Sequence, residues 1–156
     1  MTALATTRSL VCPDPDATAR LGAALASVAR AGDLLCLWGD LGAGKTHLAK
    51  AFGAALGVTE TITSPSYILM AEYRGRLPLF HIDPYRLADA ADALAGGLID
   101  ERQGDGVTLV EWPERLGEAL PVARLDVRIE GVGDEPREIT LEAGTKDYRR
   151  FLEAVA

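Results

Sequence analysis

Residues 34–46 read Leu34-Leu35-Cys36-Leu37-Trp38-Gly39-Asp40-Leu41-Gly42-Ala43-Gly44-Lys45-Thr46. The first five are apolar without alternation, a pattern typical of a parallel strand that is buried on both faces. The last eight, from Gly39 to Thr46, complete the motif G-x-x-x-x-G-K-T, which marks a phosphate-binding loop between a strand and a helix. Leu48, Phe52 and Ala55 then share one helical face. This order of strand, loop and helix predicts an α/β domain that binds a nucleoside triphosphate.

Each residue type in the loop has a physical role in holding phosphate. The glycines allow backbone conformations that turn successive N–H groups toward an anion. Lys45 adds a mobile charge, and the Thr46 hydroxyl is placed to ligate Mg²⁺. The alternative, a glycine-rich turn without a ligand, does not require Lys followed by Thr. We therefore expect nucleotide contacts along the whole loop: Gly39, Asp40, Leu41, Gly42, Ala43, Gly44, Lys45 and Thr46.

Composition and charge limit the classes of function. The chain has 156 residues, 48% hydrophobic and 25% charged, so we expect a single domain over residues 1–156. A net charge of −7 disfavours strong independent binding to nucleic acid, which depends on Lys and Arg. We see no signal-peptide pattern and no apolar run of about 20 residues, so we expect a cytoplasmic protein without membrane association. Cys12 and Cys36 match no metal spacing and are expected as reduced thiols rather than a disulfide.

Periodicity and turn residues predict the remaining elements. They are, in chain order, a helix at 14–30, strands at 67–72 and 77–82 around a turn at 73–76, a mostly helical segment at 87–100, a strand at 107–110, a short helix between Pro113 and Pro121, an antiparallel hairpin around a turn at 131–134, and a C-terminal helix containing Tyr148, Leu152 and Val155.

Two acidic residues follow apolar strands and are candidates to complete the site. Asp83 follows the strand at 77–82, and Glu111 follows the strand at 107–110. Open α/β sheets carry ligand sites at these strand ends, so Asp83 could hold Mg²⁺ or orient water, and Glu111 could ligate Mg²⁺. For Asp83 the alternative is a cap on the turn before Pro84.

Residues near these acids have two interpretations each. His81 is a packing residue or a base, and we favour packing. Trp112 either packs at a sheet edge or contributes to the site. Arg86 is a phosphate clamp or a charge partner of Asp83. The polar segment 63–67 is a plain turn or a switch that senses the terminal phosphate, as in other NTPases.

Four segments taken together resemble the TsaE family, small bacterial ATPases needed for the threonylcarbamoyladenosine modification of tRNA. The segments are the phosphate loop at 39–46, Ser-Pro-Ser-Tyr at 64–67, His-x-Asp-x-Tyr-Arg-Leu at 81–87, and Glu-Trp-Pro-Glu at 111–114. The similarity covers nearly the whole chain, from Thr18 to Arg137. Two positions depart from the family pattern: Ser66 replaces the usual Thr but keeps a hydroxyl, and His47 replaces a small hydroxyl residue.

The resemblance implies a fold, a reaction and partners. The fold is α/β, a P-loop NTPase-like, mostly parallel sheet flanked by helices and extended by antiparallel strands at the C-terminal end. The reaction is Mg²⁺-dependent hydrolysis of ATP to ADP and phosphate, in support of the modification of tRNAs that decode ANN codons. The implied partners are the TsaB and TsaD proteins, with TsaD performing the threonylcarbamoyl transfer. Contact with tRNA is expected through this complex.

The resemblance also implies roles for individual residues. Thr46 and Glu111 hold Mg²⁺, and Lys45, Asp83 and Glu111 serve hydrolysis. Arg137 contacts the nucleotide, and the stretch 14–18 lies near the base. The residues of the switch and of partner contacts are Ser64, Ser66, Tyr85, Arg86 and Trp112.

Two other functions are compatible with the same loop. A small-molecule kinase uses it to transfer phosphate to a hydroxyl group, although the chain is short and has no Arg-rich lid. A non-catalytic adaptor would use nucleotide binding alone to drive assembly. The sequence lacks the Asn-Lys-x-Asp motif that reads guanine.

Overall fold

A seven-stranded sheet organises the computed structural model, which describes residues 6–40, 42–62, 70–84 and 104–155. The strand order across the sheet is β1-β7-β6-β2-β5-β4-β3. The strands are β1 (Thr7–Cys12), β2 (Leu34–Trp38), β3 (Met70–Arg74), β4 (Pro78–Ile82), β5 (Val107–Glu111), β6 (Leu125–Glu130) and β7 (Arg137–Ala143).

The centre of the sheet is parallel and its edges are antiparallel. Strands β4, β5, β2 and β6 pair in parallel, with Leu37 beside Glu111 and Ile82 beside Val110. At one edge β7 and then β1 pair antiparallel, and at the other edge β3 pairs antiparallel with β4. The α/β class, with a parallel core and antiparallel strands from the C-terminal hairpin, is therefore confirmed.

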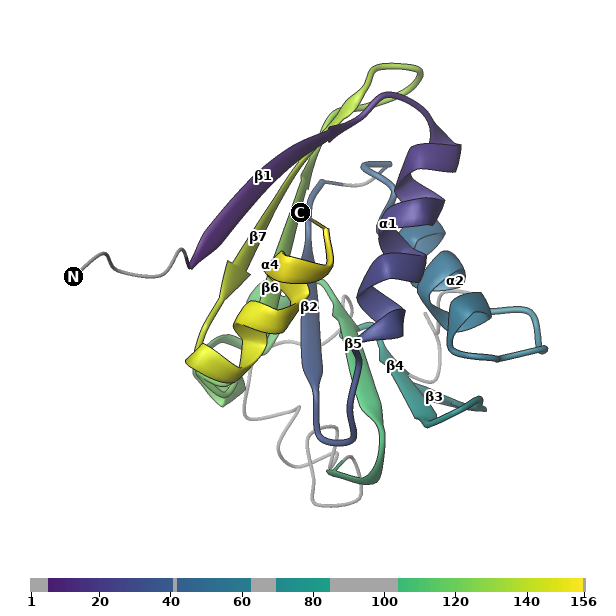
Figure 1. The fold of residues 1–156 in the computed structure, drawn as a ribbon, viewed down its shortest axis with the longest axis vertical. Coiled ribbons are helices and arrows are strands. Elements are labelled where there is room, and N and C mark those ends of the chain that lie inside the picture. The colour runs from purple at the N-terminus through teal and green to yellow at the C-terminus, as the bar shows by residue number, and fades with distance from the viewer. Residues whose placement is uncertain (1–5, 41, 63–69, 85–103, 156) are drawn as a thin grey trace.

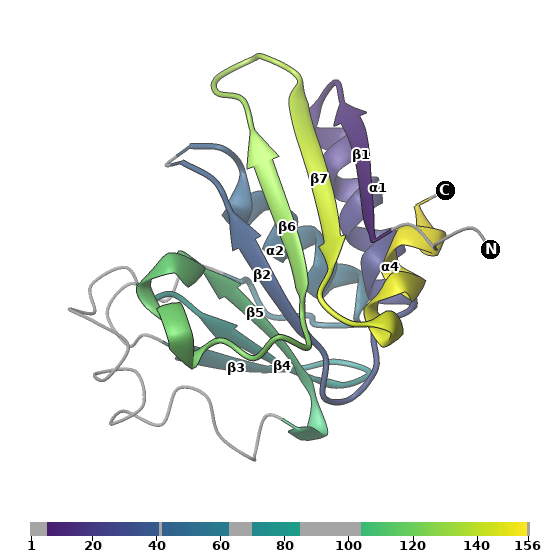
Figure 2. The same ribbon diagram turned by 90° about the vertical axis from the view of Figure 1, so that its left-hand side faces the viewer.

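Helices cover one face of this sheet. They are α1 (Pro15–Ser27), α2 (Lys45–Ala55) and the short α4 (Arg149–Ala154). Figures 1 and 2 show α1 and α2 running side by side along the sheet. Their axes approach closely at Gly22, where an added Cβ atom would lie 2.9 Å from the Cβ of Ala51. Asp14 caps α1, because its carboxylate accepts a hydrogen bond from the Ala17 N–H at 2.8 Å.

The two faces of the sheet bury cores of different size. The larger core lies between the sheet and the helices and includes Leu25, Phe52, Leu109 and Phe151. The smaller core, on the opposite face, contains Cys36 and is closed by Leu116, which lies between the 3₁₀ turns Pro113–Arg115 and Gly117–Ala119. Both cysteines are free and buried, and burial together with Asp126 raises the pKa of Cys36 to about 12.

Three sequence expectations differ from the structure. The edge strand β1 was not anticipated. The turn expected at 73–76 begins later, because Tyr73 and Arg74 still pair with Leu79 and Pro78. Two 3₁₀ turns replace the short helix expected after Pro113. The segment expected to be helical at 87–100 lies outside the described residues.

The other expected elements agree in type with the structure. The hairpin of β6 and β7 buries alternate residues and exposes the others, as the alternation predicts. In the described parts of the chain, no helix has the length and apolar character needed to cross a bilayer.

Candidate nucleotide-binding site

The candidate site lies at the edge of the sheet where the parallel strands end. Strand β2 runs into the phosphate loop, which leads directly into α2. The neighbouring strand β5 ends at Glu111, and β4 ends just before Asp83. Because β2 and β4 flank β5 on its two sides, the parallel sheet brings the loop and both acids to one edge.

Glycine is required at several positions of the loop. Gly42 and Gly44 have φ angles of 84° and 109°, in the left-handed region that side chains disfavour. Gly39 has no room for a side chain, because an added Cβ would lie 2.8 Å from the carbonyl oxygen of Ile129 on β6. Cβ atoms added at Gly42 and Gly44 would meet no atom within 4 Å. The loop is thus packed against β6 at its start and open where phosphate is expected.

Lys45 is held inside the site by its neighbours. Its side chain is 5% exposed, and Nζ donates a hydrogen bond to the Gly39 carbonyl oxygen at 2.5 Å. The same ammonium group lies 3.2 Å from the ring centroid of Trp112, a cation–π contact. Desolvation lowers the pKa of Lys45, while the carboxylates of Glu111 and Glu114 act in the opposite direction.

Trp112 reaches this position through an uncommon backbone conformation. It is the only non-glycine residue in the described part of the chain with a positive φ, 52°. Trp112 directly follows Glu111 at the end of β5 and precedes the 3₁₀ turn that begins at Pro113. The backbone strain is associated with the placement of an aromatic ring under the loop lysine.

A chain of polar contacts links α2, β5 and β4. The Thr46 hydroxyl lies 3.0 Å from Oε1 and 3.3 Å from Oε2 of Glu111. Glu111, 3% exposed, also accepts a hydrogen bond from His81, whose Nε2 lies 2.6 Å from Oε2. Asp83, two residues beyond His81, is buried at 5% exposure. Thr46, Glu111 and His81 are thus joined by hydrogen bonds. The carboxylate of Asp83 acts on the same region, because it partly offsets the desolvation that lowers the pKa of Lys45.

Arg137 binds the phosphate loop from the other side. This first residue of β7 donates from Nε to the Ala43 carbonyl at 2.8 Å and from Nη2 to the Gly42 carbonyl at 3.4 Å. It also donates to the carbonyls of Gly133 and Glu135 in the β6–β7 turn. Arg137 therefore ties the loop to the hairpin through main-chain oxygens.

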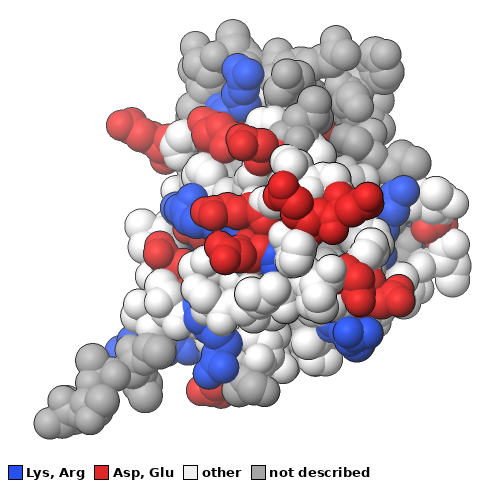
Figure 3. All heavy atoms as spheres, turned by 90° about the horizontal axis from the view of Figure 1, so that it is seen from above, with Lys and Arg blue, Asp and Glu red and all other residues white. Residues whose placement is uncertain are grey.

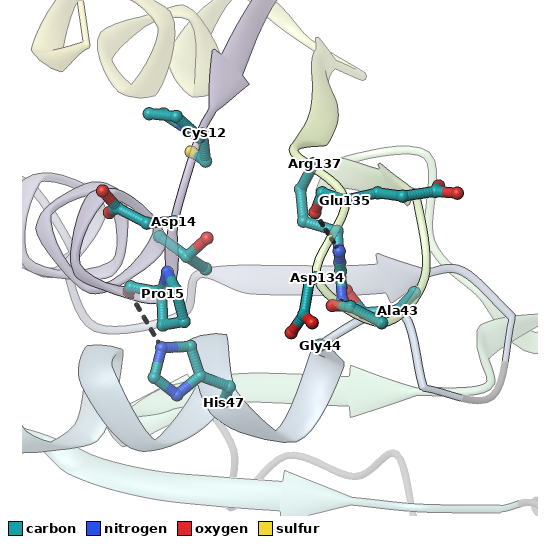
Figure 4. Close-up of a pocket in the computed structure, with 12 residues that line it drawn as sticks. Cys12, Asp14, Pro15, Ala43, Gly44, His47, Asp134, Glu135 and Arg137 are labelled. Atoms are coloured by element: carbon teal, nitrogen blue, oxygen red, sulfur yellow. Dashed lines mark hydrogen bonds between the residues drawn. The ribbon is translucent and has the colours of Figure 1, made fainter.

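A pocket of about 300 Å³ opens beside the loop (Figure 4). One wall is the start of α1, the other is the β6–β7 turn, and between them lie Ala43 and Gly44 of the phosphate loop. His47 on α2 crosses to the first wall, where its Nε2 lies 3.0 Å from the Pro15 carbonyl. The lining residues are Cys12, Pro13, Asp14, Pro15, Thr18, Ala43, Gly44, His47, Gly133, Asp134, Glu135 and Arg137.

The donor set at Thr46 and Glu111 suits a magnesium ion that is shared with phosphate. Both residues offer oxygen atoms, which Mg²⁺ prefers. Among the described residues no group of three or more His, Cys, Asp and Glu side chains converges as a metal cage. Mg²⁺ in nucleotide sites is commonly bound by one or two protein oxygens together with phosphates and water, so the small donor set is compatible with this ion.

Comparison with known proteins places the chain in a family. The model of the family described as "Threonylcarbamoyl adenosine biosynthesis protein TsaE" matches residues 12–139. The chain belongs to the TsaE family. The TsaE protein of Bacillus subtilis is 41% identical over 144 residues, covering 92% of this chain and 90% of that protein. The TsaE protein of Streptomyces coelicolor is 42% identical over 124 residues, covering 76% of this chain and 83% of that protein.

A solved structure agrees with this TsaE assignment. The crystal structure of YdiB from Bacillus subtilis superposes with a TM-score of 0.78 at 35% sequence identity. The superposition covers 97% of this chain and 95% of that chain. The resemblance that the sequence motifs indicated is therefore confirmed at the level of family and fold.

The structure brings together several of the residues expected for a TsaE site. Lys45 contacts Trp112, Thr46 contacts Glu111, and Asp83 follows the adjacent strand. Arg137 contacts the loop backbone, and nucleotide binding by its side chain stays a prediction. The expected residues that lie outside the described ones are Leu41, Ser64, Ser66, Tyr85 and Arg86.

Two features of the site were missed by sequence reasoning. The burial and hydrogen bonding of His81 agree with a packing residue, but its hydrogen-bond partner, Glu111, was not predicted. The β6–β7 turn was expected only as a turn, yet it forms one wall of the pocket. A histidine within an apolar strand next to a strand that ends in an acid is the available signal for the first feature.

Proposed function

We propose that this chain is a Mg²⁺-dependent ATPase that acts in the biosynthesis of threonylcarbamoyladenosine in tRNA, together with the TsaB and TsaD proteins. The observation that carries the proposal is the contact between Thr46, at the end of a glycine-rich loop, and the strand-end acid Glu111. This pairing joins a phosphate-binding element to an oxygen ligand for Mg²⁺. Membership of the TsaE family supports the tRNA pathway.

Lys45 is the proposed phosphate-binding cation. In the structure its ammonium group is shared between the Gly39 carbonyl and the Trp112 ring. Phosphate oxygens carry full negative charge and form stronger hydrogen bonds to an ammonium group than a neutral carbonyl does. We therefore expect ATP to draw Lys45 from these partners toward its terminal phosphates.

Thr46 and Glu111 are the proposed holders of Mg²⁺. A hydroxyl group has one hydrogen to donate and two oxygen lone pairs. Thr46 can therefore donate a hydrogen bond to Glu111 and at the same time offer a lone pair to the cation. The bound ion would supply positive charge that offsets the charge of the phosphates. The remaining ligands would come from phosphate and water.

Asp83 is the proposed hydrolytic residue. It is a buried carboxylate at the end of β4, beside the strand that carries Glu111. In this role it accepts a proton from the attacking water, whose oxygen bonds to the terminal phosphorus of ATP as the bond to ADP breaks and ADP leaves. Catalysis by this chain then consists of positioning and charge stabilisation rather than covalent chemistry.

The pocket beside the loop is the proposed site of the adenine base. It adjoins Gly44, the residue that precedes α2, and one of its walls is the start of α1. A base placed there would keep its triphosphate within reach of the loop. The expectation that the stretch 14–18 lies near the base is compatible with this wall, which includes Asp14, Pro15 and Thr18.

The surface around the candidate site is acidic, and this charge affects which partners can bind there. Figure 3 shows acidic side chains across the face seen from above and basic side chains mostly at its margins. Exposed acids at this end include Asp14, Asp40, Asp134 and Glu135. Such a face repels the tRNA backbone, so we propose that tRNA is engaged through TsaB and TsaD in the cytoplasm. The nucleotide state of this chain would then alter its docking on these partners.

The deciding experiment measures ATP turnover by the chain alone and with TsaB, TsaD and tRNA, while modified tRNA is quantified. We expect turnover and repeated rounds of modification to require the wild-type chain and to fail with Lys45→Ala. Modification that proceeds equally without the chain would refute the proposal. A phosphorylated small-molecule product would instead indicate a kinase, and full modification with a non-hydrolysable ATP analogue would indicate an adaptor.

A further inference from the structure

His81 is a fully buried residue whose polar contact is directed at the proposed metal ligand. It lies on β4 at 0% exposure, and its Nε2 is 2.6 Å from Oε2 of Glu111 on β5. Because a carboxylate only accepts hydrogen bonds, Nε2 carries the hydrogen of this contact. Nδ1 has no hydrogen-bond partner within the described structure, so the bond to Glu111 is the ring's one polar interaction there.

Glu111 is consequently held from two different elements. Thr46, on α2, lies nearest to Oε1 at 3.0 Å, whereas His81 lies against Oε2. A single contact at the end of a flexible side chain leaves the carboxylate able to rotate. Contacts from two sides fix the plane of the group and keep Oε1 on the side of Thr46.

We propose that His81 is a positioning residue, which fixes the Glu111 carboxylate and thereby sets the affinity of the nucleotide-loaded site for a divalent cation. The inference rests on the proposed function of Thr46 and Glu111 as Mg²⁺ holders. His81 itself touches neither the cation nor ATP. Loss of a hydrogen-bond partner behind a metal ligand weakens metal binding by about 10- to 100-fold, and we expect a loss in this range.

The test compares two variants of the full-length chain that differ in one hydrogen-bond donor. Glutamine places an amide N–H near the position of the histidine Nε2, whereas methionine has similar length and no donor. Mn²⁺ is used as the probe, and its binding to the ADP-loaded protein is measured by electron paramagnetic resonance. We expect His81→Met to weaken Mn²⁺ binding by about 10-fold or more and His81→Gln to restore most of the affinity.

Two controls separate positioning from folding. Binding of ADP in the presence of EDTA should be the same for wild type and both variants, because this binding requires the loop but not the cation. His81→Leu provides a second donor-free variant if His81→Met unfolds. In a Glu111→Gln background, exchange of His81 for methionine should change Mn²⁺ binding little, because the carboxylate that His81 positions is already lost.

The outcomes distinguish this inference from the proposed function. Wild-type Mn²⁺ affinity in His81→Met would overturn the role of His81 and leave the proposed function intact. Equal losses in His81→Met and His81→Gln would also overturn it, since a residue that only packs gains nothing from a donor. A wild-type protein that binds ADP but no Mn²⁺ would refute the proposed metal site itself, and the inference with it.

Discussion

The phosphate loop is held by different means on its two sides. On the β6–β7 side, Gly39 packs against the Ile129 carbonyl and Arg137 binds the carbonyls of Gly42 and Ala43. On the side of β5 and β4, the contacts are made by side chains: Lys45 with Trp112, and Thr46 with Glu111. The first side fixes the backbone of the loop, and the second carries the charges that would meet a nucleotide.

Contacts that fix the loop backbone are thus distinct from contacts of the groups proposed to bind ATP and Mg²⁺. Arg137 engages the carbonyl oxygens of Gly42 and Ala43, the type of loop group that would repel phosphate, while backbone N–H groups are the type that binds it. The side-chain contacts, in contrast, involve the same groups that ATP and Mg²⁺ would recruit, so they must rearrange on binding. Substitutions on the two sides should therefore differ in their effects on nucleotide binding and on hydrolysis.

The largest effect is expected on the charged side, from Lys45→Ala. ATP affinity should fall by about 100-fold or more, because hydrogen bonds to charged groups contribute about 1.5–3 kcal/mol each and Lys45 can form several with phosphate. Isothermal titration with ATP measures the change. Lys50→Ala is the matched control, an exposed lysine on the same helix. Tight ATP binding by Lys45→Ala would contradict the assignment.

Asp83→Asn, also on the side of β5 and β4, should impair ATP hydrolysis without impairing ATP binding. We expect hydrolysis to slow by about 100-fold while ATP affinity changes little, because the amide is a poor proton acceptor for water. Phosphate release is measured at saturating ATP in the presence of TsaB and TsaD. Glu118→Gln serves as the control, because Glu118 is an exposed acid in the 3₁₀ turn Gly117–Ala119. An equal loss of ATP affinity would instead assign Asp83 to binding.

Arg137→Lys tests the side that fixes the backbone. Lysine keeps the positive charge but cannot bridge several carbonyls with a planar group, so ATP affinity should fall by about tenfold. Arg128→Lys, an exposed arginine on the adjacent strand β6, is the control. Unchanged affinity in Arg137→Lys would indicate that charge alone matters and that the carbonyl contacts do not shape the loop.

The smallest expected effect is on the pH dependence of the free energy of unfolding, through Lys45. Burial lowers the pKa of Lys45 below its ordinary value of 10.5, so over the interval between the two values the unfolded chain binds more protons than the folded one. The free energy of unfolding of wild type relative to Lys45→Met should therefore rise as pH increases through the folded pKa toward 10.5. Urea unfolding of both proteins across this range provides the measurement, and a falling difference would contradict the sign.

Local sequence patterns predicted the loop and the strand-end acids better than the contacts of Arg137 with the loop backbone. The strand, loop and helix from Leu34 to Ala55 are encoded by adjacent residues, and their positions agree with the structure. The strand-end acids were also identified, because each directly follows an apolar run. The Arg137 contacts join residues 94 and 95 positions apart, and the motif pattern alone does not contain that geometry.

Strand β1 and the His81 contact were missed for related physical reasons. The segment Thr7–Cys12 is mostly exposed and pairs with β7 through its backbone, so its side chains show no clear alternation. The bond between His81 and Glu111 depends on the parallel register of β4 and β5, which brings together residues 30 positions apart. Register of this kind is set by packing of the whole sheet.

The placement of the pocket wall on a hairpin tip has a consequence for protein engineering. The tip residues Gly133, Asp134 and Glu135 are exposed and lie beyond the buried ladder of β6 and β7. Surface turns accept changes in sequence and length more readily than the strands that carry them. If the base binds here, libraries confined to the side chains of Asp134 and Glu135 would change base preference while the proposed catalytic groups, which lie on other elements, stay unaltered.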